Sequence, residues 1–128
     1  MSEHADITIC TVSFQSRRWL DPNWDLTLHL NGLSQVKWIV AENSPANSDQ
    51  RLRADDARFK VIAGAEFEPR LHAAGSFHHG NGMNKTLEHI NTRYVLFLDP
   101  DFFIVRKGWI NEVIDHMGTT NTAIFGAP

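Results

Sequence analysis

Short apolar runs alternate with polar stretches along the chain. Three runs rich in β-branched residues predict strands at residues 7–14, 36–41 and 59–62, the last of them near a sheet edge. Residues 94–98 are apolar without a break, which is typical of a strand covered on both faces in a parallel sheet. A further strand is expected at residues 122–125.

Helical spacing and capping residues predict four helices between these strands. One begins at Asp21-Pro22 and ends at Asn31-Gly32, because Asp caps helices, Pro suits the first turn and Gly favours a stop. Residues 48–58 are charged with few apolar anchors and predict a short surface helix. Two amphipathic stripes mark the others: Met83, Leu87 and Ile90 after Gly80-Asn81-Gly82, and Ile110, Val113, Ile114 and Met117 before Gly118.

Strands that alternate with helices predict an α/β fold, a Rossmann-like three-layer sandwich with a mostly parallel sheet. The 128 residues suffice for one domain with a buried core, without an internal repeat, linker or low-complexity tract. Residues 64–79 show no periodicity, and we expect this long segment to fold over a ligand. Its pair His78-His79 lacks the further ligands that a zinc site needs.

Two carboxylates, Asp99 and Asp101, follow the apolar run and are separated by Pro100. The carboxyl ends of parallel strands line the place where open α/β sheets bind ligands. Pro100 favours extended geometry at Asp99, and side chains two positions apart in an extended segment point the same way. Because carboxylate oxygens suit Mg²⁺ or Mn²⁺, the pair is a candidate cation site. The alternative is a polar turn that closes a buried strand, which the bare pattern favours and the context of the other strand ends disfavours.

Polar side chains also mark the ends of the first two strands. Ser13 ends the first, and Glu42 with Asn43 follows the second. Glu42 either accepts hydrogen bonds from a ribose hydroxyl or a base, as acids at this place do in nucleotide-binding folds, or belongs to a turn capped by Asn43 and Ser44. Both interpretations stay open.

Gly80-Asn81-Gly82, at the predicted start of a helix, is a weak signal for phosphate binding. Asn84 and Lys85 would lie in the first turns of that helix, where backbone donors and the helix dipole favour anions. A glycine-rich entry into an amphipathic helix explains the same residues without a ligand.

The composition argues against several classes of protein. The net charge of −3 gives no electrostatic basis for binding nucleic acid or an anionic membrane. No apolar run approaches a membrane-spanning length, and residues 1–6 lack the features of a signal peptide. Cys10 is the single cysteine, so no internal disulfide forms, and a reducing compartment fits. We therefore expect a cytoplasmic protein without a membrane span.

Taken in order, these strand ends resemble the N-terminal, nucleotide-binding part of a family-2 type glycosyltransferase of the GT-A fold. The resemblance runs through nearly the whole chain, and the ordered set is more specific than any single piece. The matching elements are Val12-Ser13-Phe14, residues 38–44, Asn84, and residues 96–101 with the DxD motif Asp99-Pro100-Asp101.

The resemblance implies a hexosyltransferase-like enzyme that transfers a sugar from a nucleotide-diphosphate donor to a saccharide, lipid or protein acceptor. It implies that Asp101 ligates Mn²⁺ or Mg²⁺ on the diphosphate and that Asp99 assists or touches the ribose. The cation would neutralise charge on the leaving diphosphate. The nucleotide-binding residues that it implies are Val12, Ser13, Phe14, Glu42, Asn43, Asn84 and Asp99.

The chain departs from the family pattern in two places. The family usually has Asp-Asn-Gly-Ser or a similar sequence after the second strand, where this chain has Glu42-Asn43-Ser44-Pro45. The basic loop residue that reaches the diphosphate in many members has only His78 or His79 as a rough counterpart. In the family the general base and the acceptor platform come later in the chain. The base is therefore expected beyond Pro128, and residues 1–128 are expected to be a single truncated donor-binding domain.

Two other functions stay open. A nucleotidyltransferase would use paired acids on an NTP, but it normally has a glycine-rich, basic phosphate loop after the first strand, and residues 14–18 contain no glycine. A non-catalytic nucleotide-binding fragment would need no base. An exposed sheet edge at the last predicted strand would allow a homo-oligomer.

Overall fold

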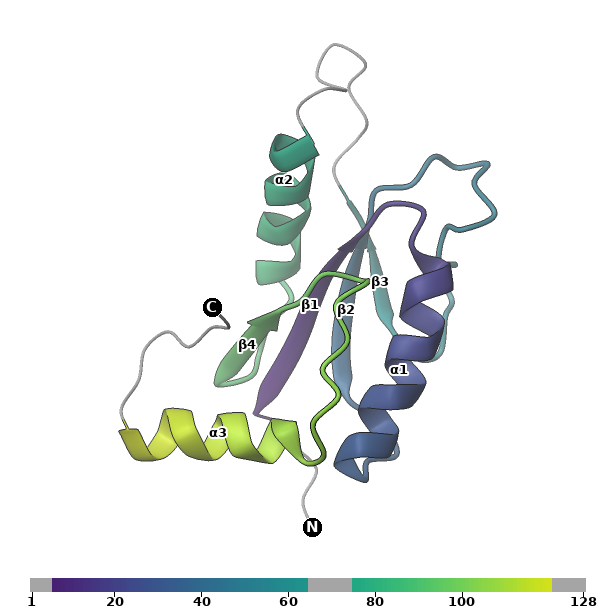
Figure 1. The fold of residues 1–128 in the computed structure, drawn as a ribbon. Coiled ribbons are helices and arrows are strands. Elements are labelled where there is room, and N and C mark those ends of the chain that lie inside the picture. The colour runs from purple at the N-terminus through teal and green to yellow at the C-terminus, as the bar shows by residue number, and fades with distance from the viewer. Residues whose placement is uncertain (1–5, 65–74, 121–128) are drawn as a thin grey trace.

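The structure, a computed structural model, describes residues 6–64 and 75–120, without the side chains of residues 75–78. Its described strands form one parallel sheet in the order β3-β2-β1-β4, with helices on both faces (Figure 1). The expected Rossmann-like α/β sandwich is confirmed, and the third strand lies at an edge as predicted. The strands are β1 (Ile7–Ser13), β2 (Lys37–Glu42), β3 (Lys60–Ala63) and β4 (Tyr94–Phe97).

Two helices lie on opposite faces of the sheet. The described helices are α1 (Arg17–Asn31), α2 (Gly75–Leu87) and α3 (Trp109–Thr120). Trp38 of β2 packs against Trp24 of α1, whereas Val12 of β1 lies beside Ala41 of β2 and close to Gly82 of α2. Because side chains alternate along a strand, Trp38 and Ala41 point to opposite faces, and so α1 and α2 cover opposite faces (Figure 1).

The main core lies between the sheet and α1. The rings of Trp24 and Trp38 have centroids 6.3 Å apart, and the Phe59 ring lies 5.2 and 5.3 Å from them. The buried Nε1 of Trp38 donates a 2.9 Å hydrogen bond to Oγ1 of Thr11, so the large side chain leaves no polar atom unpaired. Trp109 of α3 joins this cluster. The strands are thereby held on a rigid scaffold.

Helix α1 begins earlier than predicted. The amides of Trp19 and Leu20 donate to the carbonyl of Ser16, so the helix starts at Arg17, and Pro22 lies inside it. Burial of Leu20, which is 0% exposed, gives this extra first turn a place in the core. The predicted stop is confirmed, because Gly32 adopts the left-handed conformation (φ 63°) that ends helices.

The prediction of a helix at residues 48–58 is wrong. This segment is a series of turns between β2 and β3. Its backbone donors bond to side chains instead of a helical ladder: the amide of Leu52 donates to the Glu42 carboxylate, and the amides of Arg58 and Phe59 donate to the carboxylate of Asp56. Such local bonds compete with a helix and here replace it.

The start of α2 and the end of α3 also differ from the prediction. Helix α2 begins at Gly75, so Gly80-Asn81-Gly82 lies inside the helix and not at its start. Asn84 and Lys85 therefore lie near the C-terminal end of α2, where the helix dipole does not favour anions. Helix α3 continues through Gly118 to Thr120.

Strand β4 is covered on one face within the described part of the chain. Tyr94 and Leu96 pack against the core, whereas Val95 and Phe97 are 38% and 48% exposed. The prediction that β4 is covered on both faces is therefore wrong. Helix α2 packs against β1 and β2, and the face of β4 that carries Val95 and Phe97 stays partly exposed. The strand predicted at residues 122–125 and most of residues 64–79 lie outside the described residues. None of the helices described is long and apolar enough to cross a membrane.

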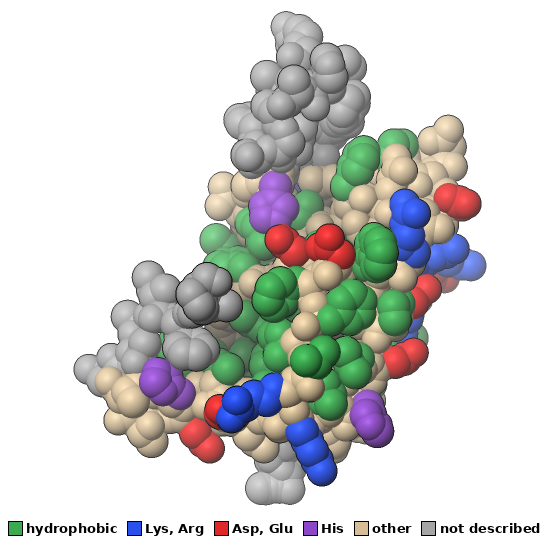
Figure 2. All heavy atoms as spheres, in the orientation of Figure 1, with side chains coloured by type: hydrophobic (Ala, Val, Ile, Leu, Met, Phe, Trp, Pro, Cys, Tyr) green, Lys and Arg blue, Asp and Glu red, His purple; other side chains and the backbone are tan. Residues whose placement is uncertain are grey.

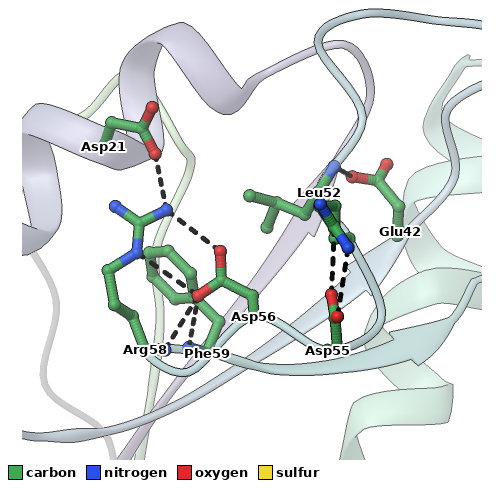
Figure 3. A network of polar contacts seen from close by, with 8 residues as sticks. Asp21, Glu42, Leu52, Asp55, Asp56, Arg58 and Phe59 are labelled. Atoms are coloured by element: carbon green, nitrogen blue, oxygen red, sulfur yellow. Dashed lines mark hydrogen bonds and ion pairs between the residues drawn. The ribbon is translucent and has the colours of Figure 1, made fainter.

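The turns between β2 and β3 contain an acid-sensitive ion pair (Figure 3). The Arg58 guanidinium lies 3.0 Å from Asp56 and 2.7 Å from Asp21. Burial alone would raise the pKa of Asp56, but hydrogen bonds from the side chain and backbone of Arg58 outweigh it, and the pKa is lowered. The folded state then binds fewer protons than the unfolded state at acid pH. This stabilisation is full above the unfolded-state pKa and is lost as pH falls through the folded-state pKa.

We expect Asp56→Asn to reduce the acid sensitivity of the fold. Urea unfolding measured from about pH 7 down to about pH 3 should show a smaller loss of stability for this variant than for the wild type. Asp55→Asn is the matched control, because its partner Arg53 and Asp55 itself are 79% and 73% exposed, and such pairs contribute little. Equal pH slopes for the two variants would contradict the assignment.

Candidate functional site

The strand order places a topological switch point between β1 and β4. From β1 the chain continues to β2 and β3 on one side of the sheet, and β4 then pairs with β1 on the other side. In open α/β sheets, ligands bind outside the carboxyl ends of strands at such a point. The amide of Leu98 still donates to the carbonyl of Cys10, so the chain pairs with the first half of β1 up to this point and then leaves the sheet. Ser13 ends β1 and Asp99 comes two residues after β4, and these are the two strands that flank the switch point.

The two predicted acids lie on a tight turn. The amide of Phe102 donates a 3.1 Å hydrogen bond to the carbonyl of Asp99, which closes a β-turn with Pro100 at its second position. The turn interpretation is confirmed, and the expectation of an extended segment at Asp101 is wrong. Both carboxylates are exposed, and Nε2 of His79 lies 3.5 Å from Oδ1 of Asp99. The turn thus presents two acids to solvent just past β4.

A buried asparagine attaches this turn to α1. Nδ2 of Asn23 donates to the carbonyls of Pro100 and Phe102, at 3.2 and 3.0 Å, and Asn23 is 1% exposed. Its Oδ1 accepts from Thr27, 3.4 Å away. Sequence reasoning missed Asn23. The available signal was an amide on the helix face that also carries the buried residues Leu20, Trp24 and Thr27.

Glu42 is buried, and its carboxylate is fully engaged by the protein. Oε1 accepts from Oγ of Ser13 at 3.1 Å. It also accepts from the amide of Leu52 at 2.6 Å (Figure 3). Oε2 accepts from the amide and the hydroxyl of Ser44, at 2.9 and 2.5 Å. The carboxylate therefore joins the ends of β1 and β2 to the following turns. No helix lies among the described residues between β2 and β3, so Asn43 and Ser44 do not cap one as that interpretation expected, and Glu42 itself accepts from the turn. A contact of Glu42 with a nucleotide stays a prediction.

The same network holds the turn between β1 and α1. Oγ of Ser44 accepts a 2.6 Å hydrogen bond from the amide of Gln15. Gln15 has φ 53°, a left-handed conformation that residues other than glycine adopt at a cost. Oγ of Ser16 bonds both the amide and the carbonyl of Phe14. The backbone beside the switch point is thus fixed in an unusual conformation without a glycine.

The side chain of Asn43 lies against two glycines. A Cβ on Gly64 would meet Oδ1 of Asn43 at 1.7 Å, and a Cβ on Gly82 would meet its Nδ2 at 3.4 Å. The Gly82 Cβ would also meet the two methyl groups of Val12 at 2.8 and 3.0 Å. Val12 and Asn43 are therefore packed under α2 beside the carboxyl edge of the sheet.

Asn84 is the predicted site residue that the structure does not bring to this group. It is exposed on α2, two positions from both Gly82 and Thr86, which are buried. Two positions along a helix turn the side chain by about 200°, so Asn84 points away from the sheet.

We expect Gly82→Ala to cost stability although alanine favours helices. The methyl group would overpack against Val12, at about 1–3 kcal/mol, against a gain of about 1 kcal/mol from helix propensity. Gly80→Ala is the matched control in the same helix, because nothing lies within 4 Å of its Cβ, and it should stabilise. Urea midpoints measure the difference. Equal stabilisation by both substitutions would contradict the close approach of α2 to β1.

Exposed aromatic side chains flank the acidic turn. Phe14 follows β1, Phe102 ends the turn, and Trp19 lies one helical turn before Asn23 on α1; they are 52%, 50% and 46% exposed. Figure 2 shows hydrophobic side chains gathered on the face that carries the segment from β4 to α3, around acidic side chains. A flat apolar ring could stack against such side chains.

The described residues offer few ligands for a metal ion. No group of three or more His, Cys, Asp or Glu side chains among them is arranged to hold one. Asp99 and Asp101 supply two exposed carboxylates. This donor set fits Mg²⁺ or Mn²⁺, because such ions keep several waters and are often held by one or two carboxylates and the phosphates of a substrate.

Comparisons with known proteins add no further residues to this site. No protein-family model, no curated protein and no solved structure matches the chain.

Proposed function

We propose that the chain binds a nucleotide-diphospho-sugar through Mn²⁺ or Mg²⁺ and serves as the donor-binding part of a glycosyltransferase. The observation that carries the proposal is the position of the Asp99–Asp101 turn. It stands past the carboxyl end of β4, the strand that pairs with β1 where the strand order reverses.

In this proposal Asp101 and Asp99 hold the cation and, through it, the diphosphate. The bound cation would neutralise the negative charge that develops on the leaving nucleoside diphosphate. Asn23 would keep the turn in place through its bonds to Pro100 and Phe102. Because Asn23 is buried in α1, the acids are anchored to a rigid element.

The nucleoside would lie over the end of β1. Phe14 offers an exposed ring. Val12 and Ser13 would meet the nucleoside through their backbone, because the side chain of Val12 packs against Gly82 and that of Ser13 bonds to Glu42. Glu42 would act mainly by holding Ser13 and Ser44, because its oxygens already accept four hydrogen bonds. The acceptor would be a saccharide, lipid or protein, and no described residue is assigned as general base. The proposed location is the cytoplasm, where the buried thiol of Cys10 would stay reduced.

Calorimetric titration with UDP, GDP, ADP and dTDP, each with and without Mn²⁺, tests the proposal. We expect at least one diphosphate to bind, and to bind more tightly with the cation. Absence of binding for all four diphosphates, with and without Mn²⁺, would contradict the proposal. Hydrolysis of the matching sugar donor in the absence of an acceptor would distinguish an enzyme from a passive binder.

A further inference from the structure

A cavity of about 490 Å³ opens at the amino ends of the strands, whereas the acidic turn follows the carboxyl end of β4. Lys37 and Lys60, the first residues of β2 and β3, line it together with Thr8 near the start of β1. Gln35, His89, Asn91 and Arg58 also line it. The volume is within the range of small-molecule sites, about 300–1,000 Å³. The cavity lies at the amino ends of the strands, so it is separate from the proposed donor site.

The sheet register places the two lysines on one face. Lys37 pairs with Thr8, and Lys60 pairs with Ile39, which is two positions after Lys37 on β2. Paired residues of parallel strands and residues two apart on one strand share a face, so both ammonium groups lie on the α2 side of the sheet. Diagonal positions of neighbouring strands are close enough for two long side chains to reach one ligand. Neither lysine has an ion pair within residues 6–64 and 75–120.

The cavity has a positive lining in a chain of net charge −3. No described residue that lines it is acidic. Arg58 also lines it, but its guanidinium is paired with Asp21 and Asp56 at 2.7 and 3.0 Å (Figure 3). Among the described residues, the positive charge of the cavity that has no ion-pair partner therefore comes from Lys37 and Lys60. The amides of Gln35 and Asn91 add neutral donors.

We infer that this cavity binds a small phosphorylated metabolite through Lys37 and Lys60. A phosphate monoester carries between about −1.5 and −2 charges at neutral pH, which two ammonium groups would balance. The ammonium group of lysine binds phosphate as a point charge and imposes no fixed geometry. Two flexible lysine side chains at the amino ends of neighbouring strands can therefore bind one phosphate together. The cavity exceeds the size of a lone phosphate, so the ligand carries an organic part that fills the rest. The inference does not depend on the proposed donor site.

Titration of the whole chain with glucose 6-phosphate, with EDTA present to remove divalent cations, tests the inference. Amide chemical shifts report where the probe binds. We expect saturable changes at residues lining the cavity, and at least about tenfold weaker binding by a Lys37→Gln, Lys60→Gln double variant. This variant should fold, because both lysines are exposed and surface substitutions of this kind change stability little. Glucose, which has no phosphate, should cause no changes.

A second double variant, Lys85→Gln with Lys107→Gln, is the matched control. Both lysines are exposed, and neither lines the cavity. It should bind the probe as the wild type does, which would show that the site and not the overall charge attracts the phosphate. Equal weakening by the two double variants, changes centred on the Asp99–Asp101 turn, or no saturable change would each overturn the inference.

Discussion

Replacing Asp101 by alanine is expected to lower the affinity for a nucleoside diphosphate in the presence of Mn²⁺ by more than about 100-fold. Losing a residue that merely supports a metal ligand typically costs about 10- to 100-fold, and losing the ligand itself should cost more. A 100-fold loss corresponds to about 2.7 kcal/mol. The turn itself should persist, because the bonds that hold it involve the backbone of Asp99, Pro100 and Phe102 and the side chain of Asn23.

Calorimetric titration of the wild type and the variant, with and without Mn²⁺, checks this expectation. Asp25→Ala is the matched control, because it removes the same charge from an exposed position on α1. It should leave the affinity within about threefold of the wild type. If Asp101→Ala bound the diphosphate as tightly as the wild type in Mn²⁺, coordination by Asp101 would have to be abandoned.

The fold could be predicted because its main elements have strong local signals. The β-branched run before Ser13 forms β1, and the apolar run before Glu42 forms β2. Gly32 ends α1 as predicted because its left-handed conformation is one that side chains disfavour. Strands that alternate with helices then leave a parallel sheet as the simplest architecture.

The features that were not predicted depend on contacts between distant residues. The segment after Ser44 forms turns instead of the predicted helix. One reason is that the amide of Leu52 donates to the Glu42 carboxylate and not to a backbone carbonyl of a helix. Gly82 lies inside α2 because the helix approaches Val12 closely there. In the sequence alone, a glycine at this position indicates a break between elements and so predicts a helix start there. The partnership of Asn23 with the acidic turn joins residues far apart in the chain, which no local pattern indicates.

Part of the candidate site could be predicted from local patterns, and part of it depends on contacts between distant residues. The acids after β4 could be located, because an apolar run followed by carboxylates is visible in the sequence. Their conformation could not, since Asp-Pro-Asp is compatible with both an extended segment and a turn. The cavity at Lys37 and Lys60 depends on the register of β2 against β3 and on where α2 ends, and neither is visible in a single sequence.

Glu42→Gln is expected to lower the free energy of unfolding by about 2–4 kcal/mol. An amide can still accept hydrogen bonds at one atom, but its NH₂ group would face donors that the carboxylate now satisfies, either Ser44 or Ser13 and Leu52. Buried donors left without an acceptor are costly, and bonds to a charged acceptor are stronger than those to a neutral one. Urea unfolding at neutral pH measures the loss.

Glu112→Gln is the matched control for this substitution. Glu112 forms an exposed pair with Arg106, with side chains 54% and 73% exposed, so its loss should change stability by less than about 1 kcal/mol. Diphosphate affinity measured on the same variants separates the two interpretations of Glu42. A large loss of stability supports its role as the buried acceptor that joins Ser13, Ser44 and Leu52. A fold as stable as the control, with diphosphate binding lost, would instead indicate a direct contact between Glu42 and the nucleotide.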